Sequence, residues 1–193
     1  YNEEKCIKPL ITNIQKIDST TNKNVEIVFL NDGSTDDTLK FISTWIPKYL
    51  KLKILSHPIN LGYGAALNSG IELAEGKYIV SMDSDGQHDS RDALKLLKIL
   101  SNQKTALMLI GTRANEKSFE IRNIAKYFLK VFQNYILGVN FKDANSGMKA
   151  LEKSSYKIIN KYFPVPFDMT FSQYIPLILS ILDKRFVNEV NIK

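Results

Sequence analysis

The sequence predicts an α/β fold in which helices flank a mostly parallel central sheet. Short β-rich runs alternate with segments of helical periodicity through the first half of the chain, and this β-α-β-α order is typical of parallel sheets. Two carboxylates, Asp83 and Asp85, directly follow one apolar, β-rich run. With 193 residues, of which 44% are hydrophobic, the chain can form one sizeable core. We therefore expect a single domain over residues 1–193.

The predicted strands of the first half are short apolar runs bounded by turn residues. They cover Val25–Leu30, Lys53–Ser56, Tyr78–Met82 and Leu107–Ile110, and Gly111 is expected to stop the last one.

Helices are predicted between these strands, because apolar side chains recur there every three or four residues. Gly76 is expected to cap the second of these helices at its carboxyl end. The predicted helices are Thr38–Tyr49, a segment around Leu67–Ala74, and a segment capped by Asp89 or Ser90.

The second half is predicted to be more helical. Helices are expected at Phe119–Leu137, Ser154–Tyr162 and Thr170–Leu182, followed by a strand within Arg185–Ile192. No segment reaches the roughly 20 apolar residues of a membrane span. Because the chain starts in a polar stretch rather than at Met, we expect it to be a piece of a longer protein.

The composition indicates the redox compartment of the protein but does not single out a function. There are 26 Lys and Arg residues against 20 Asp and Glu, a net charge of +6. That charge fits an acidic substrate, an anionic membrane or nucleic acid without choosing among them. A single cysteine, Cys6, excludes an internal disulfide and favours a reducing compartment.

Three polar loops follow three of the predicted strands, at Asn31–Ser34, His57–Tyr63 and Asp83–Asp89. In an alternating α/β sheet such loops gather along one edge, so Asp32 and the Asp83/Asp85 pair should face one crevice. Two neighbouring carboxylates repel each other unless a cation or a proton lies between them. Hard oxygen ligands favour Mg²⁺ or Mn²⁺ as that cation.

Six short motifs follow one another along the chain: Tyr1-Asn-Glu-Glu4, Asn31-Asp-Gly-Ser-Thr-Asp36, Asn60-Leu-Gly-Tyr-Gly-Ala-Ala66, Asp83-Ser-Asp-Gly-Gln87, Gly111-Thr-Arg113 and Asn145-Ser-Gly147. They occur in the order found in family 2 glycosyltransferases, and the resemblance runs from Tyr1 to about Ile192, nearly the whole chain. More narrowly, the chain resembles the dolichol-phosphate mannosyltransferases and polyprenyl-phosphate glycosyltransferases.

The resemblance implies a GT-A fold and an inverting, metal-dependent transfer of a sugar from a GDP- or UDP-linked donor to a lipid phosphate. It implies that Asp85 and Arg113 serve catalysis. Asp143 is expected either to act as a base or to position the acceptor. The other implied roles are nucleoside or donor contacts for Tyr1, Glu3, Asp32 and Asp83, metal ligands in Asp83, Asp85 and Gln87, and acceptor-phosphate contacts for Arg113, Arg122 and Ser146, with Asn145 in the same loop.

A basic face on the predicted 119–137 helix leaves two interpretations open. Arg122, Lys126 and Lys130 fall at four-residue spacing. They form either a solvated surface or a face that rests on anionic lipid. We expect the protein in the cytoplasm, at the cytoplasmic face of a membrane.

Other functions remain as alternatives. The acceptor could be a saccharide or a protein. Asp83-Ser-Asp-Gly86 also fits the turn of haloacid-dehalogenase-type phosphatases, with Asp83 as nucleophile, although Gln87 stands where those enzymes have Thr. The glycine pattern after residue 60 lacks the third glycine of a dinucleotide site. No nucleic-acid-binding motif is recognisable, so nucleic acid is not expected as a partner.

Overall fold

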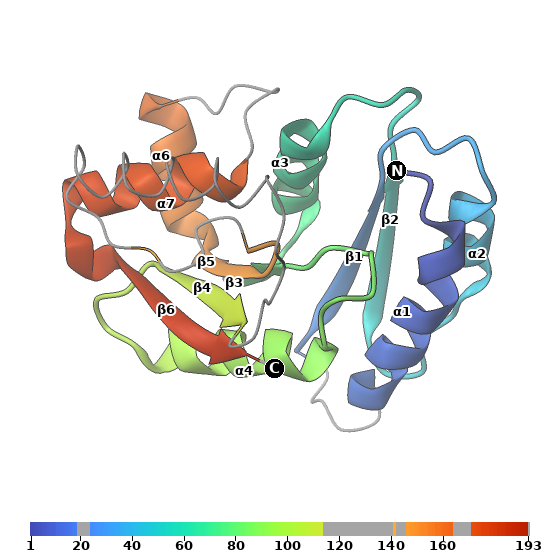
Figure 1. Cartoon of the computed structure of the whole chain (residues 1–193), viewed down its shortest axis with the longest axis horizontal. Helices are drawn as coiled ribbons and strands as arrows, with labels where there is room; N and C mark the ends of the chain where they lie inside the picture. Colours follow the sequence, from blue (N-terminus) through green and yellow to red (C-terminus); the bar gives the residue numbers. More distant parts are fainter. Residues whose placement is uncertain (19–23, 114–140, 142–145, 164–170, 193) are drawn as a thin grey trace, which may run out of the picture.

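The computed structural model describes residues 1–18, 24–113, 141, 146–163 and 171–192, which form two sheets with helices around them (Figure 1). The strands are β1 Glu26–Asn31, β2 Lys51–Ser56, β3 Tyr78–Ser81, β4 Met108–Arg113, β5 Lys149–Glu152 and β6 Val187–Ile192. The helices are α1 Glu4–Asp18, α2 Thr38–Thr44, α3 Tyr63–Leu73, α4 Ser90–Asn102, α6 Lys153–Tyr162 and α7 Phe171–Leu182, and a 3₁₀ turn, η1, covers Lys184–Phe186.

The sheet topology is mixed. β1 pairs with β2 in parallel, and the larger sheet has the order β3-β5-β4-β6. β4 and β6 are parallel, whereas β5 lies between β3 and β4 and is antiparallel to both. The predicted α/β alternation is thus confirmed for the first half of the chain. The antiparallel strand β5 was not predicted.

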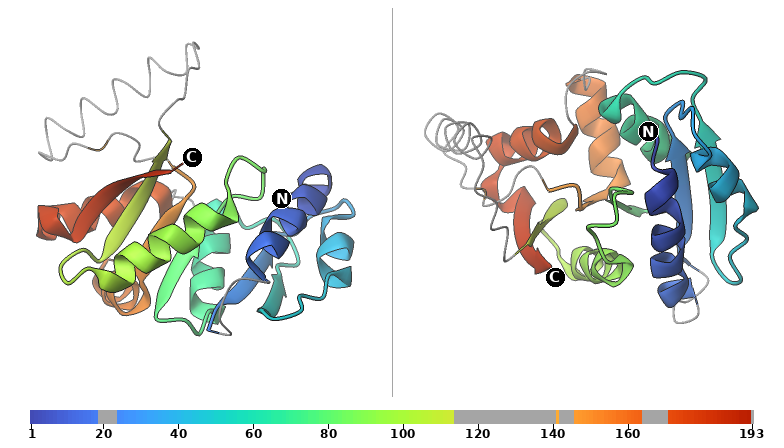
Figure 2. Two further views of the ribbon diagram at one scale, coloured as in Figure 1. Left: turned by 90° about the horizontal axis from the view of Figure 1, so that it is seen from below. Right: turned by 45° about the vertical axis from the view of Figure 1, so that its right-hand side comes forward.

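Helices cover the faces of both sheets, as the turned views show (Figure 2). α4 packs against β3, β4 and β5, and α6 and α7 lie on the opposite side of the larger sheet (Figure 1). α2 contacts β1 and β2, and α1 contacts both α2 and α4. α1 therefore bridges the smaller sheet and the helix that follows β3.

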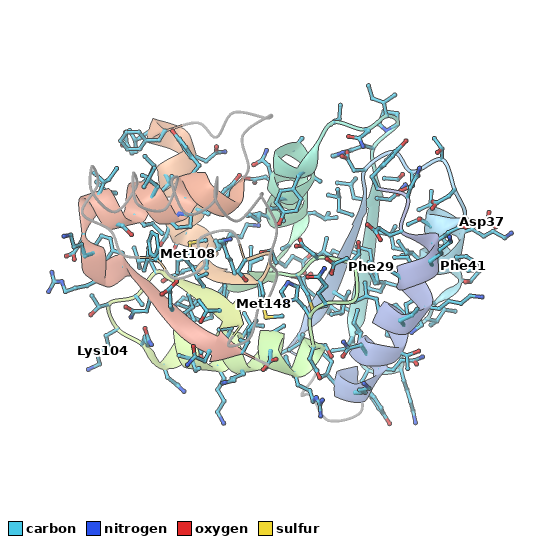
Figure 3. The ribbon with its side chains drawn as sticks, viewed as in Figure 1. Phe29, Asp37, Phe41, Lys104, Met108 and Met148 are labelled. Carbon is cyan, nitrogen blue, oxygen red and sulfur yellow. The ribbon has the colours of Figure 1, made fainter. Side chains whose placement is uncertain are left out.

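The buried core divides into clusters that match these layers. One joins α1 to β1 and α2, where the rings of Phe29 and Trp45 meet edge to face with centroids 5.9 Å apart. Another lies under α4 and includes Met148, while a third lies beneath α6 and α7 and includes Met108. Both methionines are fully buried, Met108 at the start of β4 and Met148 just before β5 (Figure 3).

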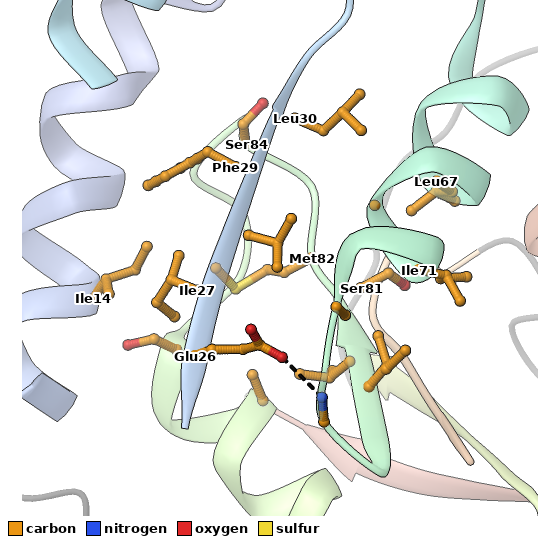
Figure 4. A pocket seen from close by; sticks show the side chains of 18 of the residues that line it. Ile14, Glu26, Ile27, Phe29, Leu30, Leu67, Ile71, Ser81, Met82 and Ser84 are labelled. Atoms are coloured by element: carbon orange, nitrogen blue, oxygen red, sulfur yellow. Dashed lines mark hydrogen bonds between the residues drawn. The ribbon is translucent and has the colours of Figure 1, made fainter. Parts of the chain in front are cut away.

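A cavity of about 720 Å³ separates β1 from β3, which are not hydrogen-bonded to each other. Its walls are largely apolar: Ile27 and Phe29 come from β1, and Leu67 and Ile71 come from α3 (Figure 4). Five of its polar lining residues belong to the loops that follow β1, β2 and β3 and to the chain start, namely Tyr1, Asp32, Asn60, Asp83 and Ser84.

Several predicted boundaries were wrong. α2 ends at Thr44 rather than Tyr49, because the chain turns extended at Trp45, two residues before Pro47. α3 ends at Leu73 with an extended Ala74, so Gly76 is no helix cap.

The prediction that Gly111 stops its strand was also wrong. β4 runs through Gly111 to Arg113. A Cβ at Gly111 would lie 2.9 Å from Ile192 Cδ1, so the glycine serves close packing inside the sheet.

Other predicted elements were confirmed. β1, β2, β3, α6, α7 and β6 lie within a few residues of their expected places, and the carboxylate of Asp89 caps α4 by accepting a hydrogen bond from Arg91 N. The predicted helix at 119–137 lies outside the described residues. Among the described helices, none has both the length and the apolar character needed to cross a membrane.

Candidate active site

Three loops meet at the carboxyl ends of β1, β2 and β3. Asp32, after β1, accepts hydrogen bonds from the loop after β2, and Tyr63, at the end of that loop, donates one to Asp83 after β3. The expectation that these loops gather at one edge is therefore confirmed.

Asp32 is buried and holds the second loop in place. Its Oδ1 accepts from His57 Nδ1 at 2.7 Å and from Leu61 N at 3.0 Å, and its Oδ2 accepts from Gly62 N at 2.9 Å. Burial opposes ionisation, but these hydrogen bonds outweigh it and lower the pKa of Asp32. A carboxylate offers about four acceptor directions, so Asp32 has little capacity left for a ligand.

His57 links Asp32 to α3. Its other ring nitrogen, Nε2, lies 3.0 Å from Ser69 Oγ. The order Asp–His–Ser resembles a nucleophilic triad, but Ser69 lies inside α3. The arrangement instead fixes the ring, and through it the Asp32 carboxylate.

Asp83 stands where β3 ends, and two other segments touch its carboxylate. Tyr63 donates its hydroxyl to Asp83 Oδ1 at 3.1 Å. On the other side lies Gly147, where an added Cβ would come within 1.8 Å of Asp83 Oδ2. Burial, followed by the charges of Asp83 and Asp85, raises the pKa of Tyr63, so the hydroxyl keeps its proton and remains a donor.

Asp85 lies in the same acidic region. Its Oδ1 accepts a hydrogen bond from Gln87 N at 2.9 Å, across the turn that Gly86 makes at φ +81°. Burial raises the pKa of the Cys6 thiol, and the hydrogen bond and charge of Glu3 and the charge of Asp85 raise it further. Negative charge from the start of α1 therefore adds to that of the loop after β3.

A divalent cation fits this donor set. The carboxylates of Asp83 and Asp85 and the amide oxygen of Gln87 are hard donors of the kind that Mg²⁺ and Mn²⁺ prefer. Among the described residues, no three acidic, His or Cys side chains gather to hold a metal ion. Two carboxylates leave coordination positions for ligands from a substrate, as is usual where such a cation binds phosphates.

The chain start is tied to the loop after β1. Asn2 N donates to Ser34 Oγ, and Glu3 N donates to Thr38 Oγ1. The carboxylate of Asp36 accepts from Glu4 N, at the amino end of α1. Tyr1 is 52% exposed and lies in the lining of the cavity, where a planar group could stack on it.

The predicted acceptor side is described only in part. Ser146 is almost fully buried, and its Oγ accepts from Met148 N at 3.3 Å while its carbonyl accepts from the Lys149 ammonium. Its hydroxyl thus faces its own loop rather than open space. Arg113 ends β4, and its side chain lies outside the described atoms, as do residues 122, 143 and 145.

Three residues of this site have only weak signals in the sequence. Tyr63 and Gly147 sit inside motifs quoted for the family resemblance, but nothing in either motif singles them out. His57 follows a strand as a polar loop residue, and its partner Asp32 lies 25 positions away. Such partners become visible only when the three loops are brought together.

The alternating fold, with an acidic loop at the end of β3, has the architecture of a GT-A-type domain. The family model for "Glycosyl transferase family 2" matches residues 1–159. This chain belongs to glycosyl transferase family 2.

Curated relatives agree with this assignment. The chain is 30% identical over 159 residues to the dodecaprenyl-phosphate galacturonate synthase of Rhizobium johnstonii, covering 81% of this chain and 47% of the relative. It is 31% identical to a dolichyl-phosphate beta-glucosyltransferase of Trichomonas vaginalis, covering 82% and 53%. The chain therefore spans about half the length of these relatives.

Solved structures share the fold. The mannosyltransferase PcManGT of Pyrobaculum calidifontis, in complex with GDP-Man and Mn²⁺, superimposes with a TM-score of 0.67 at 19% identity, covering 98% of this chain and 52% of that one. Glucosyl-3-phosphoglycerate synthase of Mycobacterium tuberculosis, with Mn²⁺, UDP-glucose and phosphoglyceric acid, gives 0.69 at 20% identity, covering 99% and 66%. These similarities show the GT-A fold.

Proposed function

We propose that residues 1–193 form the catalytic domain of an inverting glycosyltransferase that moves a sugar from a nucleoside diphosphate to a polyprenyl phosphate. One observation carries the proposal: Asp83 and Asp85 stand at the end of β3, beside the loop that Asp32 anchors, in a chain of glycosyl transferase family 2. Family membership argues against the phosphatase alternative.

On the donor side, we assign Asp83, Asp85 and Gln87 to a divalent cation and its diphosphate. Mg²⁺ or Mn²⁺ bound there would act as a Lewis acid and neutralise the charge that develops on the leaving diphosphate. Tyr1 and Glu3 lie at the chain start, which the loop after β1 holds in place. They are the proposed nucleoside contacts, and Asp32 supports the site by fixing the loop after β2.

On the acceptor side, the relatives named for dodecaprenyl and dolichyl phosphate support a lipid phosphate. Such an oxygen is already anionic at neutral pH, so the reaction has less need of a general base. Arg113 and Arg122 are the proposed phosphate contacts, because guanidinium groups bind phosphate through paired hydrogen bonds. Asp143 is the proposed acceptor-positioning residue.

We further propose that the domain works at the cytoplasmic face of a membrane. A polyprenyl phosphate is held in the lipid, so the domain has to approach the headgroup region to reach it. The net charge of +6 supports an approach to an anionic surface.

The donor half of the proposal is tested by thermal unfolding with Mn²⁺ and either GDP or UDP. The unfolding midpoint of the wild-type chain should rise with metal and nucleotide together, by mass action, and EDTA should remove the rise. Asp85→Asn should keep the metal-free midpoint and lose the rise. Asp37→Asn is the matched control, since Asp37 is exposed and pairs with Lys40. Full nucleotide binding in EDTA would contradict the metal site.

The acceptor half is tested with a labelled nucleotide sugar and a short polyprenyl phosphate in detergent. The label should move into the organic phase on extraction. If the sugar is turned over but the label stays in the aqueous phase, the acceptor is a saccharide or a protein instead. Release of inorganic phosphate from small phosphoesters would support a phosphatase.

A further inference from the structure

We propose that Tyr63 and Gly147 form a seat that aims the Asp83 carboxylate at the cation and the diphosphate. Neither residue is assigned a role by the family resemblance. The inference rests on the proposed function, because it assumes that Asp83 binds the metal. It adds the two residues that decide which way this ligand points.

Strand register places Gly147 beside Asp83. β3 and β5 are antiparallel, with Ser81 opposite Lys149. Continuing that register by two residues brings Asp83 opposite Gly147. Ser81 Oγ also donates to the Gly147 carbonyl at 3.2 Å, which extends the contact between the strands past the end of the ladder.

Only a glycine leaves room at this position. A Cβ at residue 147 would lie 1.8 Å from Asp83 Oδ2, 2.4 Å from its Cγ and 2.9 Å from its Oδ1. Real Cβ atoms essentially never come closer than 3.0 Å to such atoms. The side chain of Asp83 is short, so any substituent at residue 147 has to turn the carboxylate away from its present direction.

Tyr63 fixes the other side of the carboxylate. Its hydroxyl donates to Asp83 Oδ1 at 3.1 Å. Because the hydroxyl is neutral, it satisfies one lone pair of the carboxylate and leaves the negative charge available for a cation. Tyr63 is the first residue of α3, directly after Gly62, whose N–H is bound to Asp32 Oδ2. The hydroxyl therefore connects the anchored second loop to the metal ligand.

The test compares how tightly the wild-type chain and Tyr63→Phe bind Mn²⁺ in the presence of GDP or UDP. Binding is measured from the electron paramagnetic resonance signal of free Mn²⁺. Tyr63→Phe should raise the half-saturating Mn²⁺ concentration about threefold to tenfold, the range expected for one lost hydrogen bond. The metal-free unfolding midpoint should stay unchanged. Tyr162→Phe is the matched control, because Tyr162 is 67% exposed at the end of α6.

Gly147→Ala tests the other half of the seat. It should weaken Mn²⁺ binding more than tenfold, because the added methyl displaces the carboxylate itself. Gly70→Ala is its control, since a Cβ there would meet only Leu30 Cδ1, at 3.8 Å. If Gly147→Ala does not fold by circular dichroism, Tyr63→Phe alone decides.

The outcomes separate this inference from the function on which it rests. If the wild-type chain binds Mn²⁺ with nucleotide and Tyr63→Phe binds it equally well, the seat is overturned and the glycosyltransferase proposal stands. If the wild-type chain shows no metal-dependent nucleotide binding, the proposed function fails and the seat fails with it. Weaker Mn²⁺ binding by Tyr63→Phe, with both controls unchanged, supports the seat.

Discussion

Gly33 shows how a single residue joins two loops of the site. It adopts φ +68°, and a Cβ there would lie 2.3 Å from the backbone carbonyl carbon of Ile59. The turn after β1 can therefore lie directly on the loop after β2 only because residue 33 has no side chain. This contact complements the hydrogen bonds of the adjacent Asp32.

Gly33→Ala should destabilise the chain by more than the roughly 1–3 kcal/mol of a strained backbone residue, because a steric clash is added. Urea unfolding measures the loss. Gly86→Ala is the matched control, since Gly86 also has a positive φ, of +81°, but an added Cβ there meets nothing within 4 Å. Equal losses for the two variants would show that the contact with Ile59 contributes nothing.

Asp89 makes the stability of the chain depend on pH in the acidic range. Its hydrogen bonds with Arg91 lower the pKa of Asp89 from 3.8 to about 2. Because this pKa is lower in the folded state, the stabilisation is fully present above about pH 4 and is lost as the pH falls towards 2. Asp32, whose pKa is also lowered, acts in the same direction.

Asp89→Asn should therefore flatten the fall of the unfolding free energy between about pH 4 and pH 2. Asn is about as good an N-cap residue as Asp, so the start of α4 should survive the substitution. Urea unfolding across this range provides the measurement. An unchanged slope would assign the acid dependence to other carboxylates.

At the scale of secondary-structure elements, α1 holds the acidic loop after β3 in place, a role that its sequence does not indicate. Asn13 donates through Nδ2 to the His88 carbonyl at 2.9 Å, and its Oδ1 accepts from Ser90 N and Ser90 Oγ. One side chain thus fastens α1 to the end of the acidic loop and to the first residue of α4. The position of that loop depends on a helix distant in sequence.

Asn13→Ala should lower the unfolding free energy by about 1–3 kcal/mol, the cost of leaving buried polar groups unpaired. It should also weaken the binding of Mn²⁺ with GDP or UDP, because the loop that carries Asp85 loses its support. Urea unfolding and metal titration provide the two measurements. Thr12→Ala is the control, since that exposed hydroxyl bonds only within the helix, to the Lys8 carbonyl.

Two elements could not be predicted from the sequence, for different physical reasons. α1 carries a buried stripe of Ile7, Leu10, Ile14 and Ile17 at helical spacing, but it also contains Pro9, which normally marks a helix boundary. β5 has only four residues and continues directly into α6. A strand so short gives no periodicity that distinguishes it from the first turn of a helix.

The position of the acidic loop could be predicted better than the contacts that support it. Asp83 and Asp85 could be placed after a strand, because an apolar run ending in paired acids is a local pattern. The seat at Tyr63 and Gly147, the His57 contact and the Asn13 bridge could not, since each joins positions that are 20 or more residues apart. Pairing between distant residues depends on register and helix placement, which local patterns leave open.

At the scale of the whole molecule, the proposed site belongs to two sheets. Asp32 follows β1 of the smaller sheet, whereas Asp83 follows β3 of the larger one. Hydrogen bonds link the two sheets through the loops, as in the contact between Tyr63 and Asp83, while the strands themselves are separated by the cavity. A ligand that touches both acidic loops would therefore bridge the halves of the molecule.

The mostly apolar cavity between β1 and β3 should make this protein sensitive to hydrostatic compression. Looser packing between these two strands gives the folded state a larger volume relative to the unfolded one, so pressure should favour unfolding. Ala66→Leu, at a lining position in α3, should fill part of this cavity. It should therefore raise the pressure at which half of the protein is unfolded. Tryptophan fluorescence in a high-pressure cell would follow the transition through Trp45, which is buried beside β1.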